Sequence, residues 1–253
     1  MGRGRNQRRG DDDTMVSKAM SKVLRHSAQE EGLKIDSRGY VDMRELIQYL
    51  RQRGLQNINE ERIQKIVAGN DKQRFQILEE KHHSFIRATQ GHTMKCVATE
   101  DLLTKITGPG QYPVVVHGTF SKFWPLIEAG GLKRMTRNHI HFAPGLPKEE
   151  GVVSGMRAAC DIIIEIDLPH AMKDGIDFYI SDNNVILTEG LEGVLPPKYF
   201  RRVSKRNGGV ILEREAMKVE VEVKPEGGQQ ERHEVEEKQE SKPSPTHKEE
   251  DLE

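Results

Sequence analysis

The sequence predicts an α+β fold with a helix-rich N-terminal lobe and a β-rich C-terminal lobe. Apolar residues recur at helical spacing in three segments before residue 70. Short runs of β-branched residues dominate later, as in residues 113–119 (PVVVHGT) and 161–167 (DIIIEID). A hydrophobic fraction of 35% beside a charged fraction of 31% indicates a folded body with disordered ends.

These patterns divide the chain into a series of expected parts. They are a disordered basic and acidic tail (1–13), a first lobe (14–97), a linker (98–112), a second lobe (113–213) and a disordered charged tail (214–253). Charge is distributed unevenly among them, because residues 14–100 carry fifteen Lys and Arg against eleven Asp and Glu. Residues 224–253 show the opposite balance, with five Lys and Arg against ten Asp and Glu. A basic first lobe favours a polyanion as its partner.

Three helices are expected in the first lobe. Thr14 is a suitable N-cap for a helix that runs to about Arg25 and has one apolar face. Asp42 and Glu45 form a capping-box pattern at the start of a second helix, and Asn59 begins a third.

Two short strands follow these helices, at residues 74–78 and 84–87, with a charged turn between them. Three helices and a β-hairpin within about eighty residues are typical of a winged helix. By analogy, this architecture indicates nucleic-acid binding.

The second lobe is expected to begin with a strand of valines that ends in a polar tripeptide, His117-Gly118-Thr119. Gly118 allows the backbone to turn or to approach a ligand closely, because it has no Cβ. The stretch fits either a nucleotide pocket at a strand end or an ordinary strand–turn junction. Taken alone, it favours the junction, and the rest of the chain shifts the balance.

Further elements are expected beyond this tripeptide. A short helix over residues 123–128 is predicted to turn Trp124, Leu126 and Ile127 inward, and two glycines stop it. The remaining expected strands are residues 139–142, 161–167, 175–180, 185–187 and 210–212.

Polar residues gather at the ends of several of these elements. Arg25 and His26 end the first helix, where a cation is also favoured by the helix dipole alone. Residues 86–92 (IRATQGH) are rich in the donors that a phosphate needs, although a polar loop gives the same composition. His139 and His141 share one face of a strand. They have no obvious third partner for a metal, so we favour hydrogen bonding to a ligand.

The cysteines and the distribution of apolar residues indicate where the protein is expected to act. Cys96 and Cys160 form neither a disulfide framework nor a CxxC metal site. We see no apolar run of membrane-spanning length and no signal peptide. We therefore expect an intracellular protein of the nucleus, the cytoplasm or both, acting as a monomer without a membrane partner.

Five motifs, taken in order, resemble those of the RNA 2'-phosphotransferase family. The resemblance covers roughly residues 14–205. It implies an NAD-dependent enzyme that finishes tRNA splicing, with a winged-helix RNA lobe and a C-terminal lobe of the ADP-ribosyltransferase fold. The family more often has Asn at the position of Thr89 and Ser at that of Thr93. The motifs are Leu24-Arg25-His26, residues 86–92, His117-Gly118-Thr119, His139-Ile140-His141 and Ser154-Gly155-Met156-Arg157.

The resemblance also implies roles for individual residues, and it implies no metal. The catalytic set that it implies is Arg25, His26, Arg87 and Arg157. The contacts to NAD that it implies are His117, Gly118, Thr119, His139, His141, Ser154 and Gly155, without settling which of the two strand histidines faces NAD. The contacts to the RNA phosphate that it implies are Arg25, Arg87, Gln90 and His92.

The implied reaction has two steps. The RNA 2'-phosphate attacks the anomeric carbon of the nicotinamide ribose, and nicotinamide leaves. The ribose 2''-hydroxyl then attacks phosphorus, which releases RNA with a free 2'-hydroxyl and ADP-ribose 1'',2''-cyclic phosphate. The first nucleophile is already an anion, so positioned positive charge matters more than a carboxylate base.

Two alternatives to this function remain open. The same site suits ADP-ribosyl transfer that caps a terminal phosphate of RNA or DNA. The chain also suits an RNA-binding protein whose second lobe has no turnover, although the intact Arg and His set argues against this.

Overall fold

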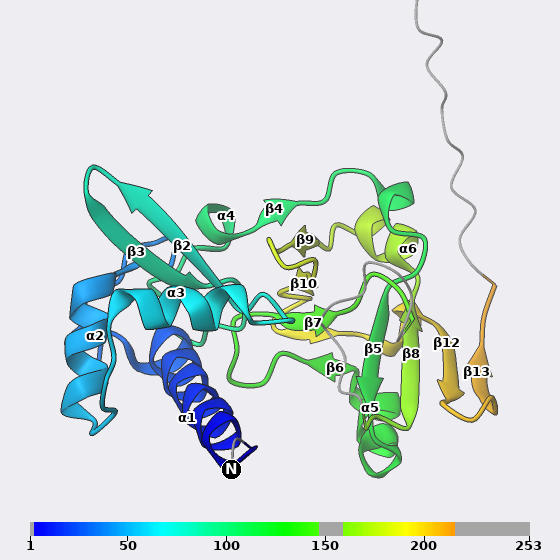
Figure 1. Cartoon of the computed structure of the whole chain (residues 1–253). Helices are drawn as coiled ribbons and strands as arrows, with labels where there is room; N and C mark the ends of the chain where they lie inside the picture. Colours follow the sequence, from blue (N-terminus) through cyan, green and yellow to red (C-terminus); the bar gives the residue numbers. More distant parts are fainter. Residues whose placement is uncertain (1–2, 147–158, 216–253) are drawn as a thin grey trace, which may run out of the picture. The chain divides into compact units, whose positions relative to one another are not determined.

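Three helices build the N-terminal part of the chain in a computed structural model that describes residues 3–146 and 159–215. They are α1 (Arg3–Lys22), α2 (Met43–Gln52) and α3 (Glu60–Ala68) (Figure 1). Helix α1 begins well before Thr14, so residues 3–13 are helical rather than the tail expected from their composition. The carboxylates of Asp12 and Asp13 accept bonds from Arg62 of α3 at 2.6 and 2.7 Å, which ties this segment to the lobe.

The apolar face of α1 forms one wall of the first core, as the helical spacing predicts. Val16, Met20 and Leu24 are fully buried, and the helix continues into a single π-helical turn, η1 (Val23–Ser27). Each such side chain contributes about 1.5–3 kcal/mol through its burial. The other large, fully buried side chains of this core are Met43, Leu46, Leu50, Ile58, Ile63 and Ile86.

The expected caps of α2 and α3 are largely confirmed. Asp42 Oδ1 accepts from the Arg44 backbone N–H at 2.7 Å, and Asn59 Oδ1 accepts from that of Arg62 at 2.9 Å. Glu45 differs from the capping-box prediction, because its carboxylate accepts from the Lys34 backbone N–H at 3.0 Å. It therefore anchors the preceding loop to the helix.

The predicted hairpin consists of β2 (Phe75–Glu80) and β3 (His83–Ala88), which pair antiparallel. Lys81 and His82 connect them with φ values of 45° and 73°, the left-handed conformation that tight hairpin turns need. A two-residue strand, β1 (Val41–Asp42), pairs with the other edge of β3. The first lobe thus combines three helices with a three-stranded sheet of order β1-β3-β2.

Among its described residues, the C-terminal part holds two four-stranded sheets, so the fold is α+β as predicted. The first, of order β13-β12-β8-β5, consists of β5 (Val116–Thr119), β8 (Ile162–Ile166), β12 (Phe200–Lys205) and β13 (Val210–Glu213). The second, of order β4-β9-β10-β7, consists of β4 (Thr104–Lys105), β7 (Ile140–Phe142), β9 (Tyr179–Ile180) and β10 (Ile186–Thr188). A third, two-stranded sheet pairs β6 (Leu132–Lys133) with β11 (Val194–Leu195).

Strand β5 ends in the tripeptide as predicted, but it begins only at Val116. His117-Gly118-Thr119 forms its last three residues, paired with Ile164, Ile163 and Ile162 of β8. Two of the preceding valines are buried, and the backbone N–H and C=O of Val116 bond to Ala143 beyond β7. This exchange links the two larger sheets beside the tripeptide.

Other elements differ from the predicted pattern in detail. The expected linker, residues 98–112, contributes a helical turn, α4 (Thr99–Leu102), and strand β4. Helix α5 (Trp124–Gly130) buries Trp124, but Leu126 is 74% exposed, so the prediction that it faces inward is wrong. Strand β12 and helix α6 (Leu168–Lys173) were not predicted; a register irregularity between Phe200 and Arg202 breaks the alternation that marks a strand.

Both lobes belong to one compact unit, Met1–Val219, and hydrogen bonds join them. The Asn183 side chain donates to the Lys72 carbonyl at 3.0 Å, and the Asn138 N–H donates to the His92 carbonyl at 2.9 Å. From residue 216 onward, the tail expected over 214–253 lies outside the described residues. Within the described ranges, none of the helices combines the length and the apolar character that crossing a membrane requires.

Candidate active site

A cavity of about 520 Å³ lies against the last residues of β5 and the first residues of β7. It brings together many of the residues that the sequence predicts as site residues, although they come from distant segments. Those that line it are Arg25, Gln90, His117, Gly118, Thr119, His139 and His141. Its volume is in the range of ordinary ligand pockets.

The lining also carries cations that the sequence analysis missed. Two of them, Lys72 and Arg74, come from the turn between α3 and β2. Three more come from residues 133–137 (KRMTR), directly before the predicted histidine strand. Among the lining residues that the structure describes there is no Asp or Glu. The cavity is therefore strongly positive.

Arg25 lies in the π-helical turn at the end of α1, and such turns are frequent at functional sites. Its Nε and Nη2 are buried and have no hydrogen-bond acceptor within the described residues. Burial, together with the positive charges of Arg137 and Arg74, lowers the pKa of Arg25 to about 10. The site therefore holds a cation at an energetic cost, which a bound anion would offset.

Gly91, within the predicted IRATQGH segment, and Thr93, directly after it, pack around Arg25. Gly91 has a φ of 89°, and a Cβ there would lie 3.6 Å from Arg25 Cδ and Nε and 3.7 Å from His141 Nε2. The Thr93 backbone N–H donates to the Arg25 carbonyl at 2.9 Å. The glycine thus allows the segment to bend between Arg25 and His141.

His26 is partly exposed and sits next to this charge cluster. Its Nδ1 lies 3.2 Å from the Thr93 hydroxyl oxygen. Thr93 therefore offers His26 the same hydroxyl group as the Ser that the family more often has at this position. Partial burial, followed by the charges of Arg25 and Arg137, lowers the pKa of His26. The ring is consequently neutral near pH 7 and able to accept a proton.

The three histidines of the strands are held in different ways. His117 Nδ1 donates to the His141 carbonyl at 2.9 Å, which fixes the hydrogen on that nitrogen. His141 Nε2 is buried without a partner among the described residues, and burial lowers the pKa of His141 well below its ordinary value. His139 is 4% exposed, with Nε2 3.1 Å from the Thr99 hydroxyl, and burial lowers its pKa as well. Across residues 3–146 and 159–215, no three His, Cys, Asp or Glu side chains are grouped closely enough to hold a metal ion.

Three predicted site residues, His26, Arg87 and His92, do not line the cavity. The guanidinium of Arg87 donates to Gln76 at 2.8 Å, to the Arg38 carbonyl at 3.1 Å and to Asp182 at 2.6 Å. His92 is 1% exposed, and burial and the charge of Arg25 lower its pKa to about 3. The role of Arg87 and His92 in contacting an RNA phosphate stays a prediction.

The predicted residues Ser154, Gly155 and Arg157 lie outside the described residues.

Comparison with known proteins decides the family. Residues 11–190 match the family model described as RNA 2'-phosphotransferase, Tpt1 / KptA family. The chain belongs to this RNA 2'-phosphotransferase family. It is 43% identical over 209 residues to a tRNA 2'-phosphotransferase 1 of Danio rerio, which covers 80% of this chain and 91% of the relative.

Two further relatives agree with this membership. A tRNA 2'-phosphotransferase of Saccharomyces cerevisiae is 38% identical over 184 residues, which is 71% of this chain and 80% of the relative. A putative tRNA 2'-phosphotransferase of Schizosaccharomyces pombe is 46% identical over 200 residues, which is 79% of this chain. The match spans only about half of that relative, 53% of its length. Membership in this family of transferases makes the chain an enzyme.

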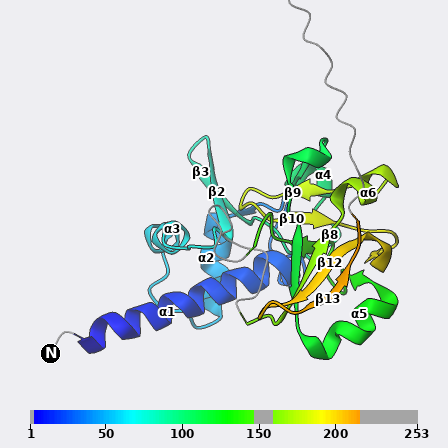
Figure 2. The same cartoon turned by 90° about the vertical axis from the view of Figure 1, so that its right-hand side faces the viewer.

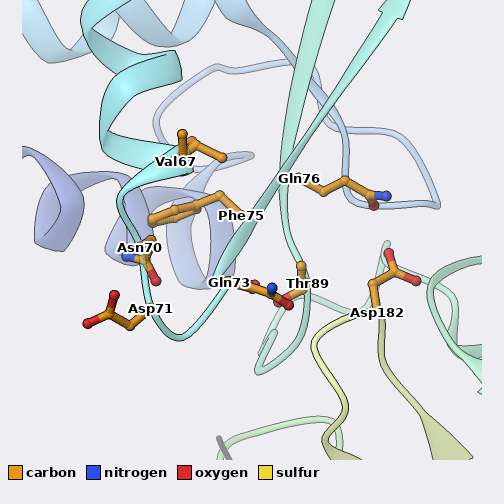
Figure 3. Close-up of a pocket in the computed structure, with 9 residues that line it drawn as sticks. Val67, Asn70, Asp71, Gln73, Phe75, Gln76, Thr89 and Asp182 are labelled. Atoms are coloured by element: carbon orange, nitrogen blue, oxygen red, sulfur yellow. The ribbon is translucent and has the colours of Figure 1, made fainter. Parts of the chain in front are cut away.

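A second hollow, lined by residues of both lobes, does not suit the substrates of a phosphotransferase. It measures about 480 Å³ and lies between the end of α3, β2 and the loop that carries Asp182 (Figure 3). Its lining includes Asp71 and Asp182 but, among the described residues, no Lys or Arg. A phosphate there would meet two carboxylates, one of them already bonded to Arg87. The basic cavity at β5 and β7 is the candidate active site of this family member.

Proposed function

We propose that this enzyme transfers the splice-junction 2'-phosphate of tRNA to NAD, giving RNA with a free 2'-hydroxyl, nicotinamide and ADP-ribose 1'',2''-cyclic phosphate. The observation that carries the proposal is the buried guanidinium of Arg25, which has two nitrogens without an acceptor among the described residues. It lies beside Arg74 and Arg137 in a cavity without described carboxylates. Family membership supports the phosphate as the group transferred.

The charges of the cavity explain why an anion is bound. The charged form of Arg25 is destabilised by burial and by the charges of Arg74 and Arg137. A phosphate bound among the three arginines offsets both the burial cost and the repulsion. Charge-assisted hydrogen bonds from guanidinium groups to phosphate are short and strong, and the planar fork allows two at once. The same charges stabilise the transition state of phosphoryl transfer, in which negative charge spreads over the phosphate oxygens.

The residues present fit NAD as the co-substrate. In the proposed reaction NAD supplies the ribose whose anomeric carbon accepts the phosphate and whose 2''-hydroxyl then displaces the RNA. Thr119 and His139 offer polar groups along β5 and beside β7, and Lys133 and Arg134 offer positive charge for a pyrophosphate. We assign the NAD contacts to these residues together with His117, Gly118 and His141.

His26 is the proposed proton carrier of the second step. The 2''-hydroxyl must lose a proton when it attacks phosphorus, and the RNA 2'-oxygen must gain one. A neutral imidazole beside Arg25 and Arg137 suits the first task, and the imidazolium that results suits the second. The Thr93 hydroxyl at Nδ1 holds the ring in place.

We assign the two lobes accordingly. The three helices and the sheet β1-β3-β2 support a winged-helix RNA-binding lobe. The two larger sheets, linked beside His117, support a C-terminal lobe of the ADP-ribosyltransferase fold.

The test uses purified protein and an RNA that carries one labelled internal 2'-phosphate. With NAD present, the label should leave the RNA and nicotinamide should appear in equal amount; without NAD, neither should occur. The same RNA with a phosphate only at its 5' end is the control for the capping reaction. Release of the label without NAD, or nicotinamide only with the 5'-phosphorylated RNA, would refute the proposal.

A further inference from the structure

A groove of about 560 Å³ runs along α1 beside the active-site cavity. Arg25 and Arg74 line both hollows, so the two are neighbours that share these arginines. We propose that this α1–α3 groove, lined by Thr14, Ser17, Lys18, Ser21, Arg25, Lys65, Asn70 and Arg74, binds the backbone of the single RNA strand that adjoins the 2'-phosphorylated nucleotide. The inference rests on the proposed function and extends it to a second site.

The wall formed by α1 is polar along its length. Thr14, Ser17, Lys18 and Ser21 recur at helical spacing and lead toward Arg25, so they form one stripe on the helix. The opposite face of α1 is buried in the core, as the full burial of Met20 shows. Hydroxyl groups and cations in a row are the groups that contact RNA phosphates and sugars without reading sequence.

The opposite wall comes from the end of α3 and the turn that follows it. Both views of the molecule show α1 and α3 side by side (Figures 1 and 2). Lys65 and Asn70 line the groove here, and Asn70 Oδ1 accepts from Arg74 Nη1 at 3.4 Å. Lys65 also pairs with Glu61 at 2.6 Å, but both side chains are about 70% exposed, so solvent weakens the pair.

The charge of the groove is positive on balance. Arg25, Arg74, Lys18 and Lys65 line it, against one described carboxylate, Asp13. That carboxylate already accepts two bonds from Arg62, at 2.9 Å from Nε and 2.7 Å from Nη2. An incoming phosphate therefore meets four cations and one neutralised carboxylate.

The two arginines shared with the cavity favour an RNA strand as the occupant of the groove. A 2'-phosphate held by Arg25 belongs to a nucleotide whose neighbours must leave the cavity, and the next phosphates of that strand carry the same charge. The groove begins at Arg25 and Arg74 and offers further cations at Lys18 and Lys65. A free nucleotide would use the cavity alone and would gain nothing from these lysines.

The test compares a short and a long substrate on charge-reversed variants. The short RNA is a dinucleotide with one internal 2'-phosphate, and the long RNA extends it on both sides as a single strand. Wild-type protein should show a higher kcat/KM for the long RNA. In the Lys18→Glu/Lys65→Glu variant, the value for the long RNA should fall about tenfold or more, close to that for the short RNA. The matched control is Lys173→Glu, which changes an exposed lysine of α6.

Binding gives a readout that does not need turnover. Fluorescence anisotropy with single-stranded RNA that lacks a 2'-phosphate should show weaker binding by the variant. The slope of log affinity against log salt should become shallower by about 0.7 for each RNA phosphate that the variant no longer neutralises. Thermal melting shows whether the variant is folded. If it is not, Lys18→Gln and Lys65→Gln are measured singly, and each should make the same slope shallower.

The outcomes separate the two proposals. An unchanged ratio of long to short substrate and an unchanged salt slope in the folded variant would overturn the groove, as would an equal loss in Lys173→Glu. If 2'-phosphorylated RNA gives no turnover with wild-type protein but binding still depends on Lys18 and Lys65, the proposed function fails and the groove stands.

Discussion

Replacing Arg25 with methionine should lower turnover by orders of magnitude and yet make the protein more stable. Methionine keeps the unbranched apolar stem and removes the buried charge. Folding lowers the pKa of the Arg25 guanidinium from its ordinary value to about 10, so its charged form is destabilised by roughly 3 kcal/mol. This cost is fully present below about pH 10 and is lost as the pH rises above it. At neutral pH, Arg25→Met should thus gain about 1–3 kcal/mol, once repacking is allowed for.

The assays are urea denaturation and thermal melting at pH 7 for both proteins, with turnover measured in parallel. The melting temperature should rise by roughly 2–4 °C for each kcal/mol gained in a chain of this size. Turnover should fall by about 10²–10³-fold or more, because the variant cannot donate the charge-assisted hydrogen bonds of the guanidinium to the transition state. The control is Arg53→Met, which removes an arginine whose side chain is 57% exposed and should leave both quantities nearly unchanged.

A further measurement uses inorganic phosphate as a ligand of the site. At constant ionic strength, inorganic phosphate should stabilise the wild-type protein more than Arg25→Met, because only the former keeps the buried guanidinium. A variant that is less stable than wild type would show that Arg25 has an internal partner. One that keeps wild-type turnover would show that Arg25 is not part of the active site.

Other substitutions give further predictions. His26→Ala should slow the second step more than the first, so rapid-quench analysis should show an RNA–phosphate–ADP-ribose adduct accumulating; unreacted RNA alone would exclude His26 from that step. Because the pKa of His26 is lowered, kcat of the wild type should hold at pH 7 and fall only as the pH drops below about 6.5. His26→Ala should lack this acidic limb. Arg87→Ala should lower the free energy of unfolding by about 1–3 kcal/mol in urea, the reverse of Arg25→Met, because Gln76 and the Arg38 carbonyl lose their donor; unchanged stability would contradict this account.

The elements that the sequence predicts well are those whose signals are local. The amphipathic spacing of α1, the Asn59 cap and the alternation of β8 each depend on residues within a few positions of one another, and the structure confirms them. Strand β12 fails this condition, because its irregular register with β8 breaks the alternation. The start of α1 fails it for another reason, since Asp12 and Asp13 find their partner in Arg62 of α3.

In the candidate site, too, residues marked by a local motif were predicted, and residues brought in by the tertiary fold were not. Motifs in the sequence pointed to Arg25, His117 and His139, and the cavity brings these together. Arg74 and Arg137 were missed, because each taken alone resembles a solvated surface cation in a loop. What makes them candidates for phosphate binding is their convergence on Arg25, which lowers the pKa of that arginine and which only the tertiary fold produces. If the proposed site is correct, the fold gathers cations around a buried guanidinium at the expense of its own stability, and Arg25→Met should therefore separate activity from stability.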